Sequence, residues 1–307
     1  MTDKIICRVL TGPTASGKSE LSVRLALDHG WDIISMDSMQ IYRRMNIGTA
    51  KPTLSEMKGV RHHMIDICEP TQKYSVAEYR DTAEKILLEL HEQKREVLFV
   101  GGTTLYLQAL MHPMGMGCVP ANTELRDRLN CQAATAEGRK RLHEQLKMID
   151  PQAAERLPVN DVRRIIRAIE VWEATGIPFS EQPERETEHE QRFVWKVVST
   201  QMDRTVLYDR INRRVSEMIR SGLKDEVEAL IREGVPPEAQ SMSGIGYKEM
   251  VPVIFGEYGL DDAAERIRTN TRHYAKRQMT FLRREEKITY IRTDHENAWD
   301  EIRRSLI

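Results

Sequence analysis

The run of eight residues at 12–19 has the composition of a phosphate-binding loop. It lies between an apolar stretch at 5–10 and a helical pattern that begins at 20, which is the setting in which such a loop holds a di- or triphosphate. Its glycines let backbone N–H groups point inward, Lys18 adds a full positive charge, and the Ser19 hydroxyl is a candidate Mg²⁺ ligand. The residues that we expect to bind pyrophosphate are Gly12, Pro13, Thr14, Ala15, Ser16, Gly17, Lys18 and Ser19.

Asp37 lies at the tip of a second strand-like stretch, 32–35. Its carboxylate could act as a general base, hold magnesium through water, or cap the next turn together with Ser38. Polar side chains in the stretches that follow, 40–42 and 46–52, could contact the edge of a base. The residue types alone leave these roles open.

The third strand-like stretch, 97–100, is followed by two glycines and Thr103, where nucleotide kinases and ATPases usually place an aspartate. This difference weakens the case for ATP hydrolysis. Thr103 could offer a hydroxyl at the mouth of the site or cap the following helix. Arg210, on a helix after the fourth stretch, could clamp a pyrophosphate oxygen or form a surface ion pair.

The order of strand-like and helical patterns predicts an α/β fold, in which crossover helices join parallel strands and catalytic groups lie at the carboxyl ends of the strands. Between 117 and 192 helical patterns replace the strand signal, so we expect a catalytic core formed by 1–116 and 193–307 with a helical insertion at 117–192. The strand-like stretches are 5–10, 32–35, 97–100, 195–200 and 288–291. Helices are expected at 75–94, opened by a capping box, at 123–136, 138–148 and 162–174, and from near 203, 223 and 261.

Composition limits the class of protein. The 307 residues carry a net charge of −1, and 40% of them are hydrophobic, enough for a sizeable core. No apolar run is long enough to span a membrane and the N-terminus does not fit a signal peptide, so we expect a cytoplasmic protein without membrane contact. The four cysteines are widely spaced and indicate neither a disulfide framework nor a zinc site. His62 and His63 are adjacent, which makes them a poor chelate and favours a loop or packing role.

The charge is unevenly distributed along the chain. Seven Lys or Arg residues and no acid lie between 266 and 284, whereas 181–190 holds five glutamates and one arginine. The basic stretch is a candidate contact for nucleic-acid phosphates, or else a solvated helix face balanced by acids elsewhere.

Eight segments carry a more specific signal: GPTASGKS (12–19), ISMDSMQIYRRMNIGTAKP (34–52), RHHMIDICEP (61–70), YSVAEYR (74–80), FVGGTTLY (99–106), NDVRRIIRAIEV (160–171), SGIGYKE (243–249) and AKRQMTFLRR (275–284). Taken together and in this order, they resemble the tRNA dimethylallyltransferase family, also called tRNA isopentenyltransferases. Phe281 stands where many members carry a tryptophan. No zinc-finger extension like that of eukaryotic relatives follows, so the bacterial type is the better match.

This resemblance implies a P-loop NTPase-like parallel sheet with an inserted all-helical subdomain. It implies transfer of a dimethylallyl group from dimethylallyl pyrophosphate to N6 of adenosine 37 in tRNA, with Mg²⁺ as cofactor and no protein partner. Lys18, Arg210 and Thr103 would be catalytic groups together with the base Asp37, and the insertion would bind the anticodon stem-loop. The residues implied to contact tRNA are Asp37, Ser38, Met39, Gln40, Thr103, Asp161, Val162, Arg163, Arg164, Ile165, Gly244, Ile245, Gly246, Tyr247 and Lys248.

Two other functions stay open from the sequence. An adenylate isopentenyltransferase would share the phosphate loop and the donor but use a free nucleotide, and would need neither the insertion nor the basic stretch. A P-loop nucleotide-binding switch would bind ATP or GTP, and RNA, without covalent chemistry.

Overall fold

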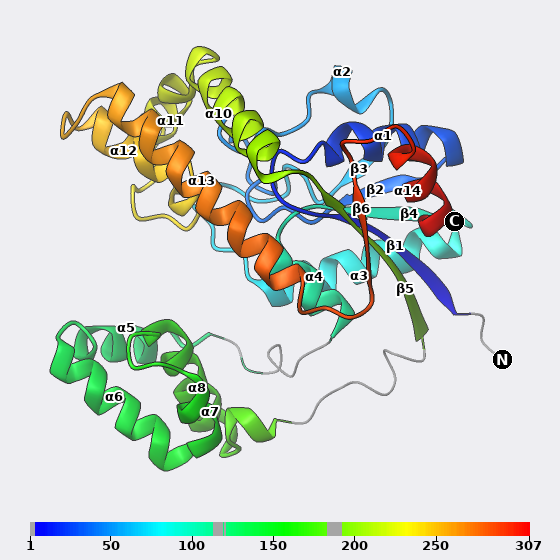
Figure 1. Cartoon of the computed structure of the whole chain (residues 1–307). Coiled ribbons are helices and arrows are strands. Elements are labelled where there is room, and N and C mark those ends of the chain that lie inside the picture. Colours follow the sequence, from blue (N-terminus) through cyan, green and yellow to red (C-terminus); the bar gives the residue numbers. More distant parts are fainter. Residues whose placement is uncertain (1–3, 113–118, 120, 183–191) are drawn as a thin grey trace. The chain divides into compact units, whose positions relative to one another are not determined.

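The computed structural model describes residues 4–112, 119, 121–182 and 192–307, which belong to two units (Figure 1). The larger unit comprises Met1–Met111 and Glu190–Ile307, and the smaller one is His112–His189. These limits lie near the predicted domain boundaries, of which the one between 116 and 117 falls outside the described residues.

A sheet of six parallel strands, in the order β3-β2-β4-β1-β5-β6, forms the centre of the larger unit. The chain leaves β1 toward β2 and β4 on one side and later adds β5 and β6 on the other, so the carboxyl end of β1 is a switch point where ligands bind in such sheets. The strands are β1 Ile5–Thr11, β2 Asp32–Ser35, β3 His62–His63, β4 Val97–Val100, β5 Phe193–Gln201 and β6 Ile288–Arg292. All five predicted strands and the predicted fold class are confirmed, and among the strands of the described residues only the two-residue β3 was not predicted.

Helices cover both faces of this sheet because successive strand residues point to opposite faces. Cys7 and Val9 of β1 pack in the cluster that contains side chains of α3 and α4. Leu10 packs in the cluster that contains side chains of α1 and α14, on the other face (Figure 1). The helices are α1 Lys18–His29, α3 Val76–Glu92, α4 Thr104–Met111 and α14 Ala298–Leu306, with a short α2 at Leu54–Met57.

The predicted capping box at the start of α3 is present. The Ser75 hydroxyl accepts the Glu78 N–H at 3.2 Å, and the Glu78 carboxylate accepts the Ser75 N–H at 2.7 Å. Two N–H groups that the first helical turn would leave unpaired are thereby satisfied. The start of this helix was therefore predicted from local chemistry alone.

A second helical layer in the same unit packs against the segment that follows β2. Ile41, Tyr42 and Met45 of that segment are fully buried in a cluster with residues of these helices. The helices are α10 Arg204–Arg220, α11 Leu223–Arg232, α12 Tyr247–Ile254 and α13 Leu260–Leu282 (Figure 1). The helices expected from near 203, 223 and 261 are confirmed, whereas α12 was not predicted.

The smaller unit is helical, and its buried side chains are mostly Leu, Ile and Ala. The helix expected at 123–136 ends earlier because the Thr135 hydroxyl accepts the Gly138 N–H at 3.0 Å and starts a new helix. A further break follows where Asp150 caps a helix that has Pro151 in its first turn. The helices are α5 Thr123–Gln132, α6 Ala136–Ile149, α7 Pro151–Arg156 and α8 Val162–Thr175, followed by a 3₁₀ turn at Phe179–Glu181.

His62 and His63 form β3 at the edge of the sheet, so they lie in a strand and not in a loop, and the fold engages both rings. His63 Nε2 lies 2.7 Å from a carboxylate oxygen of the buried Asp32, and His62 Nδ1 lies 2.9 Å from the Val60 carbonyl oxygen. In the part of the chain that the structure describes, no cluster of three or more His, Cys, Asp or Glu side chains could hold a metal ion. No described helix has the length and apolar character needed to cross a membrane.

The described cysteines, Cys7, Cys68 and Cys131, are free thiols. Burial is the main cause that raises the pKa of both Cys7 and Cys68, which keeps these two thiols protonated. Cys118 lies outside the described residues.

Candidate active site at the phosphate loop

The phosphate loop follows β1 directly and crosses the carboxyl edge of the sheet. Gly12 has a φ of 136°, and a Cβ at this position would lie 2.2 Å from Thr200 Oγ1 at the end of β5. Only glycine combines this conformation with such a close approach. Ser16 Oγ also meets Thr200 Oγ1, at 2.7 Å, so β5 fixes the loop at two points.

One residue far away in sequence fastens the loop to the next strand tip. The Gln278 side chain on α13 accepts the Thr14 N–H at 2.9 Å and donates to the Gly102 carbonyl at 2.7 Å. Gln278 is only 2% exposed, and a Cβ at Gly102 would lie 2.3 Å from its amide nitrogen. Gly102, in the glycine pair that stands where kinases and ATPases usually place an aspartate, therefore makes room for a glutamine that holds the loop.

Lys18 and Arg214 bring two positive charges to the loop. Lys18 Nζ donates to the Pro13 carbonyl at 2.7 Å, and Arg214 Nη1 lies 3.5 Å from Thr14 Oγ1. Burial and then the charge of Arg214 lower the pKa of Lys18 from 10.5 to about 7, while Asp37 acts in the opposite direction. Burial also lowers the pKa of Arg214. Two cations held this close favour a polyanion between them.

Arg210, the arginine singled out from the sequence, lies over the same loop but is exposed. Its Nη2 would be 3.5 Å from a Cβ at Gly17. Arg214 was missed by sequence reasoning, although it lies four residues further along α10, on the same helix face. That spacing was the available signal, and it indicates that the two guanidinium groups act together.

Asp37 lies just beyond β2, at the same edge. Its Oδ1 accepts the N–H groups of Met39 at 2.8 Å and Gln40 at 3.2 Å, so the turn-capping role that the sequence left open is present. Burial lowers the pKa of Lys18 and of Arg214, and the negative charge of Asp37 acts against this effect at both residues.

The negative charge of Asp37 contributes to raising the pKa of three tyrosines. The rings of Tyr79 and Tyr106 stack with centroids 3.7 Å apart, and the Tyr79 hydroxyl donates to the Ser35 carbonyl at 3.0 Å. Burial and then the charge of Asp37 raise the pKa of Tyr274 to about 12. Burial, with a smaller contribution from Asp37, also raises the pKa values of Tyr79 and Tyr106. The three hydroxyl groups therefore remain protonated at neutral pH.

Thr103 joins the β4 tip to the segment that carries Asp37. Its Oγ1 accepts the Ser38 N–H at 3.0 Å, and its N–H donates to the Met36 carbonyl at 3.2 Å. The predicted catalytic residues Lys18, Asp37 and Thr103 thus lie beyond the carboxyl ends of three neighbouring strands, β1, β2 and β4, as expected for groups that follow parallel strands.

Comparison with known proteins identifies the family. Residues 40–285 match the family model described as IPP transferase. A tRNA dimethylallyltransferase of Desulforudis audaxviator is 44% identical over 283 residues, which cover 92% of this chain and 90% of the relative. The chain belongs to the IPP transferase family. A tRNA dimethylallyltransferase of Halalkalibacterium halodurans is 41% identical over 290 residues, covering 94% and 91% of the two chains.

Solved structures of the IPP transferase family agree with this fold. The full-length tRNA isopentenylpyrophosphate transferase of Bacillus halodurans matches with a TM-score of 0.70 and 39% identity, over 99% of this chain and 95% of that one. A eukaryotic dimethylallyltransferase acting on tRNA matches with a TM-score of 0.76 and 25% identity, over 97% and 76%. The predicted resemblance and the P-loop-like core are both confirmed.

The structure also bears on the residues that the resemblance assigns to tRNA. In the 244–248 segment, Tyr247 is fully buried and Lys248 is exposed, both at the start of α12, and a Cβ at Gly244 would lie 2.5 Å from Met39 Cε. Gly244 therefore packs directly against the segment that follows Asp37. The Gln40 side chain donates within the fold, to the carbonyl groups of 49 and 50, at 3.3 Å each.

In the smaller unit, Asp161 precedes α8 and lies 3.4 Å from the guanidinium of Arg164. Arg163 and Arg164 are exposed, Val162 is half-buried, and Ile165 is fully buried in the core of its unit. Ile165 therefore has no exposed surface with which to contact RNA, whereas the side chains of Arg163 and Arg164 are exposed. RNA contact by this group stays a prediction.

The basic stretch at 266–284 lies mostly on α13, and neighbouring groups engage part of its charge. Arg268 and Arg272 pair with Glu265 at 3.2 and 3.0 Å, and the Arg266 guanidinium lies 4.6 Å from the Tyr258 ring centre. Lys276 and Arg277 are exposed on the same helix.

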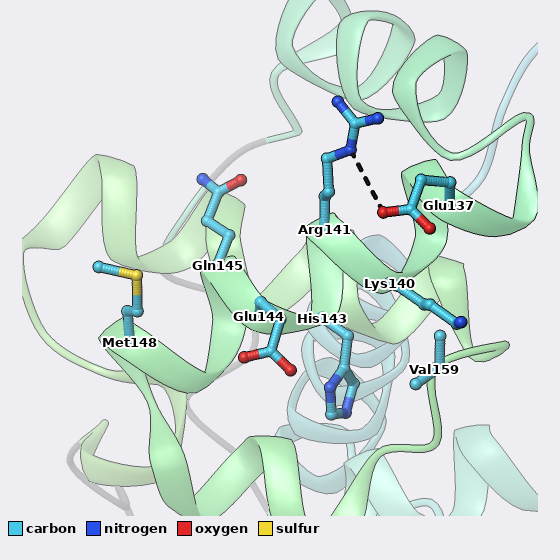
Figure 2. A pocket seen from close by; sticks show the side chains of 8 residues that line it. All are labelled: Glu137, Lys140, Arg141, His143, Glu144, Gln145, Met148 and Val159. Carbon is cyan, nitrogen blue, oxygen red and sulfur yellow. Dashed lines mark ion pairs between the residues drawn. The ribbon is translucent and has the colours of Figure 1, made fainter.

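A hollow of about 550 Å³ lies along α6 in the smaller unit (Figure 2). Arg141 pairs with Glu137 at 3.9 Å on its wall, and Lys140 and Glu144 add one charge of each sign. His143 Nε2 lies 2.8 Å from the Leu157 carbonyl oxygen, so its ring is held by the fold. The wall of this hollow carries charges of both signs, whereas the phosphate loop is contacted by the two cations Lys18 and Arg214.

The predicted metal ligand Ser19 is exposed in the first turn of α1, directly after Lys18. One hydroxyl beside phosphate oxygens and water suits Mg²⁺, which keeps several waters and takes few protein ligands at phosphate sites. The residues of the loop fit such an ion, and its binding here remains a proposal.

Proposed function

We propose that this protein transfers the dimethylallyl group of dimethylallyl pyrophosphate to N6 of adenosine 37 in the anticodon loop of tRNA. One observation carries the proposal: Lys18 and Arg214 contact the phosphate loop that follows β1, and Asp37 follows β2 at the same carboxyl edge of the sheet. The cations suit the pyrophosphate that leaves, and the carboxylate suits the proton that the amine must lose.

In the reaction, the bond between C1 of the allyl group and the pyrophosphate oxygen breaks, and a bond from N6 to C1 forms. Negative charge grows on the leaving pyrophosphate, where Lys18, Arg214 and Arg210 lie to stabilise it. Mg²⁺, held by Ser19 when bound, would neutralise further charge on the phosphate oxygens.

Asp37 takes the N6 proton. Both of its hydrogen bonds to the following turn go to Oδ1, so the base role falls to Oδ2. The adenine amine is a weak nucleophile because its lone pair is delocalised into the ring, so removal of its proton is required as the new bond forms. The adenosine must leave its stack to reach this carboxylate.

The test is mass spectrometry of nucleosides from unmodified tRNA incubated with the protein, Mg²⁺ and dimethylallyl pyrophosphate, with free AMP as a parallel acceptor. We expect an isopentenyl-sized gain on adenosine from tRNA alone. A gain on AMP would instead indicate an adenylate isopentenyltransferase, and no gain on either would favour the nucleotide switch.

The variant Asp37→Asn tests the base. Its amide oxygen can still accept from Met39 and Gln40, so the turn is retained while the basic oxygen is lost. We expect a loss of about 10²- to 10⁴-fold in prenyl transfer. Asp209→Asn, at an exposed position of α10, is the matched control and should retain activity. A fully active Asp37→Asn enzyme would overturn the assignment.

A further inference from the structure

The Glu226 carboxylate on α11 receives an unusual set of hydrogen bonds. It accepts three consecutive backbone N–H groups, those of Asn46 at 3.0 Å, Ile47 at 2.8 Å and Gly48 at 3.3 Å. It also accepts the Tyr247 hydroxyl at 2.6 Å. Hydrogen bonds to a charged acceptor are about twice as strong as neutral ones, so this carboxylate fixes the 46–48 turn firmly.

Tyr247 closes the same turn from the other side. Its side chain is fully buried, and a Cβ at Gly48 would lie 2.4 Å from its ring. Burial raises the pKa of Tyr247, with the charge of Glu226 adding to the effect, so its hydroxyl stays a donor. The ring and the hydroxyl therefore hold Gly48 against α11 and α12.

Residues 46–50 contact the 37–40 segment at the active site. The Gln40 side chain donates to the Thr49 and Ala50 carbonyl groups, each at 3.3 Å. The backbone N–H of Gln40 donates to Asp37 Oδ1 at 3.2 Å. A continuous chain of contacts thus leads from Glu226, through 46–50, to the 37–40 segment.

We propose that Glu226 and Tyr247 are positioning residues that set the 37–40 segment for the target nucleotide of the tRNA. The proposal rests on the proposed function, because it assumes that this segment meets the nucleotide. Because Tyr247 is fully buried, it cannot contact RNA directly. In this proposal it affects tRNA recognition through the 37–40 segment.

Two variants test the pair. Glu226→Gln keeps the shape but replaces one acceptor oxygen with an NH₂ group that faces the donors of 46–48 or of Tyr247. Tyr247→Phe keeps the ring against Gly48 and removes only the hydroxyl. Glu228→Gln is the matched control, because Glu228 lies on the same helix and pairs with Arg232 at 2.9 Å near the surface.

Steady-state kinetics with tRNA, pyrophosphate titration and urea unfolding are measured for each protein. Wild-type activity on tRNA is the reference, and its absence would refute the proposed function rather than this inference. We expect both variants to raise the KM for tRNA about tenfold, with kcat at saturating tRNA and the Kd for inorganic pyrophosphate changed less than about threefold. The KM for tRNA of the double variant should lie within about twofold of that of Glu226→Gln alone, because the two side chains act through one contact.

An active wild type whose variants match Glu228→Gln would overturn the inference. So would a fall in kcat at unchanged KM, which would place the pair in the chemical step, or a parallel weakening of pyrophosphate binding, which would indicate a general loss of structure. If Glu226→Gln does not fold, Tyr247→Phe alone decides between these outcomes.

Discussion

Binding of pyrophosphate should draw a proton onto Lys18. In the free protein, burial and Arg214 hold the pKa of Lys18 at about 7, well below its usual 10.5. At a pH between these two pKa values, the Lys18 side chain is largely neutral in the free protein. A polyanion bound in the loop restores its charged form. Lys18 therefore takes up a proton when pyrophosphate binds, and the number of protons taken up increases as the pH rises from 6 to 8.

The magnitude follows from the fraction of Lys18 that is neutral before binding. With a pKa of about 7 it is about 0.1 at pH 6, 0.5 at pH 7 and 0.9 at pH 8, and this is the number of protons taken up by Lys18 per bound pyrophosphate. The variant Lys18→Arg keeps the positive charge but cannot titrate in this range. It should lack this uptake.

The assay is isothermal titration calorimetry with inorganic pyrophosphate in pairs of buffers that differ in ionisation enthalpy. Uptake by pyrophosphate itself cancels in the difference between wild type and Lys18→Arg, and protons are counted per ligand bound, so a weaker Kd in the variant does not distort the result. We expect a difference of about 0.9 proton at pH 8 and about 0.1 at pH 6. Equal uptake by both proteins at pH 8 would refute the reasoning.

Two further changes test the scaffold of the site. Gln278→Glu should weaken pyrophosphate binding about tenfold, because a carboxylate in place of the amide donor would face the Gly102 carbonyl; an unchanged Kd in calorimetry would contradict the clasp between loop and strand tip. Ser75→Ala should lower the free energy of unfolding by about 1 kcal/mol through loss of the α3 cap, with kcat retained; urea unfolding at an unchanged midpoint would argue against it.

Where structure depends on neighbours in sequence, the prediction holds. The phosphate loop is recognisable because Gly12 must adopt a positive φ between a strand and a helix, and the start of α3 because Ser75 and Glu78 satisfy each other's N–H groups. The strands follow from short apolar runs that are buried in the sheet.

The short elements were harder to predict. β3 has two residues, α7 has six and α12 has eight, and helices of this length owe their stability to packing rather than to their own propensity. The sequence pattern of 123–136 also did not show the break between α5 and α6. A threonine can lie inside a helix, and only the structure shows that the Thr135 hydroxyl caps α6.

The sequence by itself determined the chemistry near each strand end: a phosphate loop with Lys18, then Asp37, then Thr103 in place of an acid. Only the tertiary structure decided which distant side chains complete the site. Gln278 reaches Thr14 across 264 positions, and Glu226 reaches Asn46 across 180. The physical reason is that a single hydrogen bond or close approach between remote residues leaves no periodic trace in sequence and exists only once the helices have packed on the sheet.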